Sequence, residues 1–206
     1  MPRVSEAEKQ RSHSRILDSA AEVVRERGVE AASLGDIMKA AGMTHGGFYR
    51  HFANKEGLVA AAIDRAADDV LSSYEVRRAN GDEEAAVDYI NEYLSDRHRL
   101  ALKSGCPLAA VAGEALRADG LVRTATQNAA RRTARLLSGP SNAEVSGDEA
   151  DDLGLATLSV LVGTIVLSRL ARDEGEAQCL LKAGARTINA LRDPSDDSEK
   201  ETMYHA

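Results

Sequence analysis

Apolar positions recur every three to four residues along most of the chain, which is the period of an α-helix. The first predicted helix ends near Gly28, because a glycine commonly follows the last turn of a helix. Ser5, three residues before Glu8, is a capping signal for its start. No stretch alternates apolar and polar residues between turns, so no sheet is expected. The buried stripe of this first helix consists of Ile16, Ala20, Val23 and Val24.

A second short helix and a turn follow directly. Ser33, three residues before Asp36, resembles a capping box with aspartate in place of glutamate. The segment Ala41–Met43 contains Gly42 and predicts the tight turn of a helix-turn-helix. The apolar side of the second helix holds Leu34, Ile37 and Ala41.

The third predicted helix combines an apolar face with an unusual polar one. Phe48 and Phe52 lie four residues apart and share one face. Thr44 and His45 occupy the N-terminal tip, where a recognition helix meets base edges. Each glycine in a helix costs about 1 kcal/mol relative to alanine, and a close approach of the backbone to a duplex would account for two of them. The alternative is a glycine-rich turn between ordinary core helices. The arc opposite the phenylalanines holds Gly46, Gly47, Tyr49 and Arg50.

These motifs in series identify a family. Residues from about Ser14 to Leu58 resemble the N-terminal domain of the TetR family of bacterial transcriptional regulators. The resemblance implies that Tyr49 and Lys55 bind DNA phosphates. A departure is Gly47, which has no side chain where many relatives have one, so base reading would fall to Thr44, His45 and Arg50. The matching residues are Ile16, Ala20, Gly28, Ser33, Ile37, Ala41, Gly42, Phe48, Tyr49, Phe52, Lys55 and Leu58. The predicted DNA-binding residues are Ser33, Thr44, His45, Gly46, Gly47, Tyr49, Arg50, His51 and Lys55.

Charge is distributed unevenly along the chain. Residues 1–56 hold nine basic against eight acidic side chains, and the remainder holds 17 against 25. An acidic protein binds DNA poorly without a specific site, so DNA contact is expected only in the N-terminal module. An apolar leader is absent, and Leu153–Leu167 is shorter than the roughly 20 residues of a membrane span. Two cysteines 73 residues apart indicate reduced thiols in a cytoplasmic protein.

The rest of the chain predicts further helices and hence an all-α fold of about nine helices. We expect a DNA-binding domain at residues 1–53, an effector-binding and dimerisation domain at 54–193, and a disordered polar tail at 194–206. The predicted later helices run over residues 54–79, 82–103, 108–117, 120–137, 146–172 and 174–191.

The last two helices predict assembly. Residues 153–167 are apolar on nearly every side, which indicates burial on several sides. The family resemblance implies that both helices pair with their copies across a twofold axis. The alternative is a core within one chain. The expected interface residues are Leu158, Leu161, Ile165, Leu180, Leu181, Gly184 and Ile188.

The middle helices hold the candidate effector site. The resemblance implies that Tyr74, Tyr89, Tyr93 and His98 line a ligand cavity, although core aromatics with satisfied hydroxyls are the alternative. Cys106 lies at a helix start near Lys103, where a thiol pKa is lowered. Cys106 would then sense oxidants or electrophiles, or else be a small buried side chain.

The sequence does not indicate metal binding, catalysis or cofactor binding. The five histidines form no metal-spaced pair with cysteine or carboxylate, and neither a nucleophile elbow nor a dinucleotide fingerprint is present. We therefore expect no cofactor, no metal and no enzyme. The sequence predicts a ligand-responsive regulator, most simply a repressor, that binds a palindromic operator as a homodimer. The alternatives are a helical enzyme or adaptor with a borrowed helix-turn-helix module, and a cysteine-based redox sensor.

Overall fold

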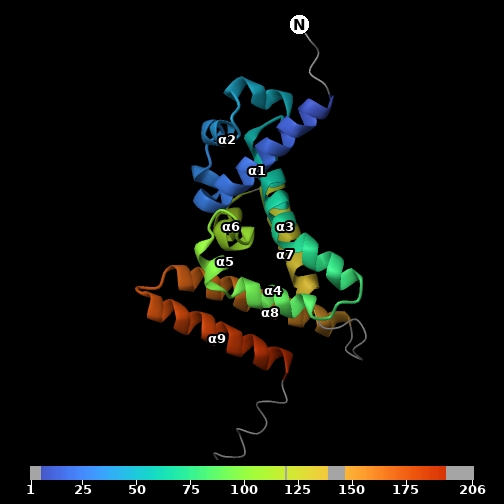
Figure 1. The fold of residues 1–206 in the computed structure, drawn as a ribbon, viewed down its shortest axis with the longest axis vertical. Helices are drawn as coiled ribbons and strands as arrows, with labels where there is room; N and C mark the ends of the chain where they lie inside the picture. The colour runs from blue at the N-terminus through green and yellow to red at the C-terminus, as the bar shows by residue number, and fades with distance from the viewer. Residues whose placement is uncertain (1–5, 119, 139–146, 194–206) are drawn as a thin grey trace, which may run out of the picture. The chain divides into compact units, whose positions relative to one another are not determined.

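The computed structural model describes residues 6–118, 120–138 and 147–193, which form helices joined by turns, with no strand among them (Figure 1). The all-α prediction is confirmed. The predicted tail at 194–206 and the capping residues Ser5 and Ser146 lie outside the described residues. The elements are α1 Glu6–Ala31, α2 Leu34–Ala40, the 3-10 helix η1 His45–Arg50, α3 Lys55–Ala79, α4 Ala85–Tyr93, α5 Asp96–Leu100, α6 Pro107–Ala115, α7 Gly120–Leu137, α8 Gly147–Arg169 and α9 Glu174–Arg192.

The chain folds into two compact units. Unit 1 joins the residues up to 72 with residues 101–130, and unit 2 joins residues 73–100 with those from 131 onward. This division differs from the functional boundary expected at residue 53, because most of α3, the whole of α6 and the part of α7 up to residue 130 belong to the same unit as the N-terminal helices. The functional division itself stays a prediction.

Unit 1 surrounds one apolar core. The first three helical elements and the start of α3 supply most of it, and α6 and α7 add Val111 and Val122. Gly28 has a φ of 82°, so it interrupts α1 as expected, and residues 29–31 form a final turn beyond it. The stripe predicted for the first helix is confirmed, since each member has 7% or less of its surface exposed. The fully buried large side chains here include Ile16, Ile37, Met38, Phe48, Leu58 and Ile63.

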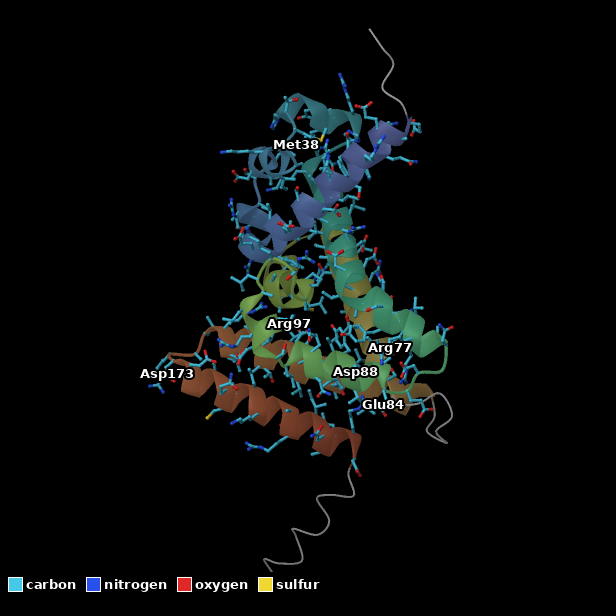
Figure 2. The ribbon with its side chains drawn as sticks, in the orientation of Figure 1. Met38, Arg77, Glu84, Asp88, Arg97 and Asp173 are labelled. Atoms are coloured by element: carbon cyan, nitrogen blue, oxygen red, sulfur yellow. The ribbon has the colours of Figure 1, made fainter. Side chains whose placement is uncertain are left out.

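Local signals set the bounds of α3 as predicted. Asn54 Oδ1 accepts the backbone N–H of Gly57 at 2.7 Å, which caps the first turn. Gly81, with a φ of 85°, follows the last turn. Arg77 then closes the connection to α4 by donating to Asp82 at 2.7 Å and to Asp88 at 2.6 Å; Arg77 and Asp88 are labelled in Figure 2.

The single helix expected over residues 82–103 is wrong, because the chain forms α4 and α5 instead. Ser95 separates them: its Oγ donates to the carbonyl of Glu92 at 2.6 Å and accepts the N–H of His98 at 3.2 Å. His98 strengthens the break through a 2.7 Å contact between Nδ1 and the Tyr93 carbonyl. A serine that ends one helix and caps the next outweighs the apolar periodicity that runs across both.

Unit 2 is built on the antiparallel pair α8 and α9, which lie side by side (Figure 1). Asp173 caps α9 by accepting the N–H of Glu176 at 2.9 Å. Gly184 lets the two helices approach, since a Cβ there would lie 2.3 Å from Thr164 Oγ1. By length and composition alone, Asp152–Arg169 would also pass for a membrane span, as core helices of soluble proteins do.

Gly154 generates the first prediction. A Cβ at this position would lie 2.2 Å from the carbonyl oxygen of Ala134, a backbone atom of α7 that cannot swing away. Gly154→Ala should therefore destabilise the protein by about 1–3 kcal/mol despite the better helix propensity of alanine. Urea unfolding followed by circular dichroism measures this difference.

Gly113 provides the matched control, because a Cβ on this α6 glycine meets nothing within 4 Å. Gly113→Ala should leave the unfolding free energy unchanged or raise it by up to about 1 kcal/mol. Equal midpoints for the two variants would show that α7 and α8 are not packed as described.

Candidate nucleic-acid interface

The helix preceding the interface is fixed by Ser33. Its Oγ accepts the backbone N–H of Asp36 at 3.0 Å and donates to Asp36 Oδ2 at 2.8 Å. The capping prediction is thus confirmed, although the aspartate bonds to the serine hydroxyl rather than to its backbone. Gly42, with a φ of 67°, makes the turn that follows α2. Ser33 itself is exposed, at the start of α2.

The predicted recognition helix is a 3-10 helix, η1, rather than an α-helix. Such short helices are poorly bonded internally and depend on packing. Phe48 supplies this packing. Only 1% of its surface is exposed, and its ring stacks on that of Phe52 with 5.9 Å between the ring centroids. Phe48 and Phe52 still share one face, because the N–H of Phe52 donates to the carbonyl of Phe48 at 3.1 Å, as in an α-helix.

The side chains beside Phe48 point outward. Tyr49 is 68% exposed although its ring packs edge-on against Phe48 at 5.0 Å. Thr44, His45 and Arg50 are exposed as well. Neither Gly46 nor Gly47 has a positive φ, so backbone conformation does not require them. A Cβ on Gly46 would touch nothing within 4 Å, so this glycine leaves the surface low where a duplex would approach.

Three basic side chains lie near His51. Burial lowers the pKa of the imidazole below its usual 6.5, and His13, Lys9 and Arg50 lower it further because their charges disfavour another proton. His13 also stacks on Phe52 at 4.7 Å and so joins this surface from α1. Lys9 and His13 of α1 thus lie near His51 together with Arg50 of η1, and basic side chains grouped in this way suit a phosphate backbone.

Lys55 lies at the start of α3 and is half-buried. Its Nζ donates to the carbonyl of Glu30 at 3.4 Å, beyond the kink of α1. Beside it opens a cleft of about 640 Å³ within unit 1. The lining residues are Val29, Glu30, Lys55, Glu56, Val59, Ala118, Gly120 and Val122.

Four of the five predicted effector residues come together in unit 2. Tyr74 lies 5.3 Å from Tyr89, Tyr89 lies 5.7 Å from Tyr93, and Tyr93 lies 4.3 Å from His98, all between ring centroids. Burial, followed by the charges of Glu92 and Asp88, raises the pKa of Tyr74. Burial likewise lowers the pKa of His98, so its imidazole is neutral at pH 7.

The fifth predicted effector residue, Cys106, belongs to unit 1, whereas the four aromatic side chains belong to unit 2. It is 3% exposed, whereas Cys179 on α9 is exposed. Within a single chain, Cys179 is therefore the more accessible of the two thiols. This burial agrees with the alternative that Cys106 is a small buried side chain.

Most residues expected at a dimer interface are buried within one chain. Only Leu180 among them keeps appreciable surface. A side chain that is fully covered by its own chain has no area left for a partner, so the helices α8 and α9 would have to use another face. Leu155 and Leu167 of α8 are half-exposed in the single chain, so burial of this helix on several sides stays a prediction for the assembled protein. The buried members are Leu158, Leu161, Ile165, Leu181, Gly184 and Ile188.

Three contributors were missed by the sequence analysis. His13 shares no motif with the phenylalanine it stacks on, and Glu56 and Glu114 bond to backbone groups 65 and 84 residues away. No spacing rule connects such positions. Among the described residues, no group of three histidine, cysteine or carboxylate side chains gathers as a metal site would.

Comparisons with known proteins agree with this architecture. Residues 16–62 match the family described as bacterial regulatory proteins, tetR family. An uncharacterised HTH-type transcriptional regulator of Mycobacterium tuberculosis, Rv0196, is 29% identical over 77% of this chain and 84% of its own. The HTH-type transcriptional regulator AcrR of Shigella flexneri is 43% identical over 28% of this chain and 27% of its own.

A solved TetR transcriptional regulator from Chloroflexus aurantiacus superimposes with a TM-score of 0.65, at 25% identity, over 89% of this chain and 96% of that one. The match thus extends from the helix-turn-helix through most of the chain. The chain belongs to the TetR family and is a DNA-binding transcriptional regulator.

Proposed function

We propose that this protein is a cytoplasmic repressor that binds a palindromic operator as a homodimer and leaves it when a small molecule binds. One observation supports this most: a buried Phe48 presents His45, Tyr49 and Arg50 to solvent, with Lys9 and His13 of α1 near the same surface. These side chains can donate to base edges and phosphates, as a recognition helix does. The relatives' shared description as transcriptional regulators supports it further.

Operator binding is tested first with DNA from upstream of the protein's own gene. The purified protein should shift that fragment at a salt concentration where an unrelated fragment stays free. Failure to distinguish the two fragments would contradict operator recognition. Compounds are then screened for release of the fragment, because only a ligand that prefers the DNA-incompetent state can shift the equilibrium.

A second prediction concerns Lys55, proposed to bind a phosphate next to η1. Lys55→Ala should weaken specific and random duplexes alike, and the slope of log affinity against log salt should fall by about 1. Fluorescence anisotropy at several salt concentrations measures the slope. Lys182→Ala, on the exposed side of α9 in unit 2, is the matched control and should keep the wild-type slope. An unchanged slope in Lys55→Ala would remove Lys55 from the interface.

The exposed face of α8 supports the homodimer. Leu155, Ser159, Val162, Gly163 and Val166 follow one another at helical spacing and carry no charge, and each keeps exposed surface in the single chain. An apolar stripe of this kind on a soluble protein usually marks an association site. We propose that this face, rather than the buried residues named from sequence, meets the partner across a twofold axis.

A third prediction tests that face. Leu155 is 50% exposed, so Leu155→Glu should leave the chain folded but place a charge in the interface, giving a folded monomer with weaker operator binding. Val76→Glu, at an exposed apolar position of α3, is the matched control and should remain a dimer. Sedimentation velocity and circular dichroism separate the outcomes, and a dimeric Leu155→Glu would refute this interface.

Ile165→Glu adds a contrast, because Ile165 is 0% exposed. It should unfold the protein instead of dissociating it, since an unpaired charge in the core is strongly destabilising. A folded monomer from this variant would return Ile165 to the interface.

The fourth prediction is a pH dependence from His51. In the free protein its pKa is below 6.5, and a phosphate placed nearby would raise it. A group with a higher pKa in the complex takes up a proton on binding, so affinity should rise as the pH falls from about 7.5 to 6. His51→Asn should flatten this rise at constant salt. Identical pH profiles for the variant and the wild type would exclude His51 from the interface.

The ring cluster of Tyr74, Tyr89, Tyr93 and His98 is our candidate effector site, supported by four aromatic groups gathered in one place. We propose neither of the two competing functions, a thiol-based redox sensor or a helical enzyme or adaptor. The burial of Cys106 speaks against a directly accessible thiol sensor. Among the described residues, no group of histidine, cysteine or carboxylate side chains gathers as in a metal-dependent enzyme, and we propose neither a catalytic activity nor a membrane partner for this chain.

A further inference from the structure

Two carboxylates of unit 1 bind backbone N–H groups of distant segments. On α6, Glu114 Oε2 accepts the N–H of Glu30, just beyond the kink in α1, at 2.8 Å. On α3, Glu56 Oε1 accepts the N–H of Leu121, in the first turn of α7, at 2.9 Å. The first bond therefore ties α6 to the end of α1, and the second ties α7 to α3, which begins at the proposed phosphate-binding residue Lys55.

Both carboxylates rest against a glycine with a positive φ. Gly28 has a φ of 82°, and a Cβ on it would lie 1.9 Å from Glu114 Oε1. Gly120 has a φ of 64°, and a Cβ on it would lie 2.6 Å from Glu56 Oε1. In each case the glycine permits the backbone conformation and also leaves the space that the carboxylate fills. The same arrangement is thus built twice in one unit.

The two bonds meet at Lys55. Glu30, whose N–H is held by Glu114, accepts from Lys55 Nζ through its own carbonyl. The residue after Lys55 is Glu56, which holds α7. A continuous set of contacts therefore runs from α6 through residue 30 to Lys55, and from there to the start of α7. The cleft described above is bordered by this set.

We infer that Glu114 and Glu56 are positioning residues for DNA binding. They fasten the end of α1 and the start of α3 to α6 and α7, and so hold Lys55 and the preceding η1 in the arrangement that DNA requires. The inference rests on the proposed function and adds to it the residues that set the geometry. Hydrogen bonds from backbone N–H groups to a carboxylate are charge-assisted, so they are stronger and more restrictive than neutral ones.

The negative charge of Glu114 and its hydrogen bond have opposite effects on DNA affinity, so the two can be tested separately. Removing a negative charge from a protein raises its affinity for DNA, because DNA is a polyanion. Losing the position of Lys55 and η1 lowers that affinity instead. Glu114→Ala and Glu114→Gln remove the same charge, but only glutamine keeps an oxygen that can accept the N–H of Glu30. The difference between these two variants therefore isolates the hydrogen bond from the charge.

The probe is a duplex that wild-type protein selects from a randomised pool, and the readout is fluorescence anisotropy. Glu114→Ala should bind this duplex about 3- to 10-fold more weakly than Glu114→Gln, as expected for loss of one such bond. The salt slope should equal that of the wild type, because no phosphate contact is removed. Glu22, an exposed glutamate on α1, gives the matched pair: Glu22→Ala and Glu22→Gln should bind equally.

Hydrogen exchange of the free protein reports the bond directly. The Glu30 amide should exchange faster in Glu114→Ala than in Glu114→Gln, with equal melting temperatures excluding global unfolding as the cause. Equal affinity of the two Glu114 variants, or equal protection of the Glu30 amide, would overturn the positioning role. A wild type that selects no duplex would instead contradict the proposed function itself.

Discussion

The burial of Phe48 is the interaction on which the proposed interface depends. Six residues of 3-10 helix are not stable alone, because nucleation costs more than so few bonds return. Phe48 lies in the core with Met38 and Ile37, and this contact orients the whole of η1. With that ring inside, Tyr49 necessarily points outward at 68% exposure. The exposed surface is therefore a consequence of packing beneath it.

The core beneath Phe48 does not end with the N-terminal helices. Val111 of α6 and Val122 of α7 belong to the same cluster, so these helices share the free energy of burial that stabilises the DNA-binding part. The hydrogen bonds of Glu114 and Glu56 add direction to that apolar contact. Hydrogen bonds are directional, so these two bonds restrict the orientation of the joined segments more than apolar contact alone does.

Local signals account for what the sequence could predict. Asn54 and Gly81 delimit α3, and the glycine turn after α2 exposes η1, because caps and positive φ values act within a few residues. The break at Ser95 was missed because one serine outweighed a periodicity that continues on both sides. The apolar pattern of α8 shows which residues avoid water, but it cannot say whether α9 or a partner covers them. Leu161 and Ile165 are buried within their own chain, whereas Leu155 is half-exposed. Contacts such as Glu114 with Glu30 join residues too distant in sequence for any spacing rule.

The most direct measurement of the central claim is a selection of duplexes from a randomised pool by three proteins: wild type, His45→Ala and Arg50→Ala. The account predicts that wild type enriches an inverted repeat whose half-sites are centred about one helical turn, or a multiple of it, apart. Each variant should keep the repeat but lose base preference at one position in each half-site. Enrichment of an unrepeated sequence, or of the same sequence by all three proteins, would contradict base reading by η1.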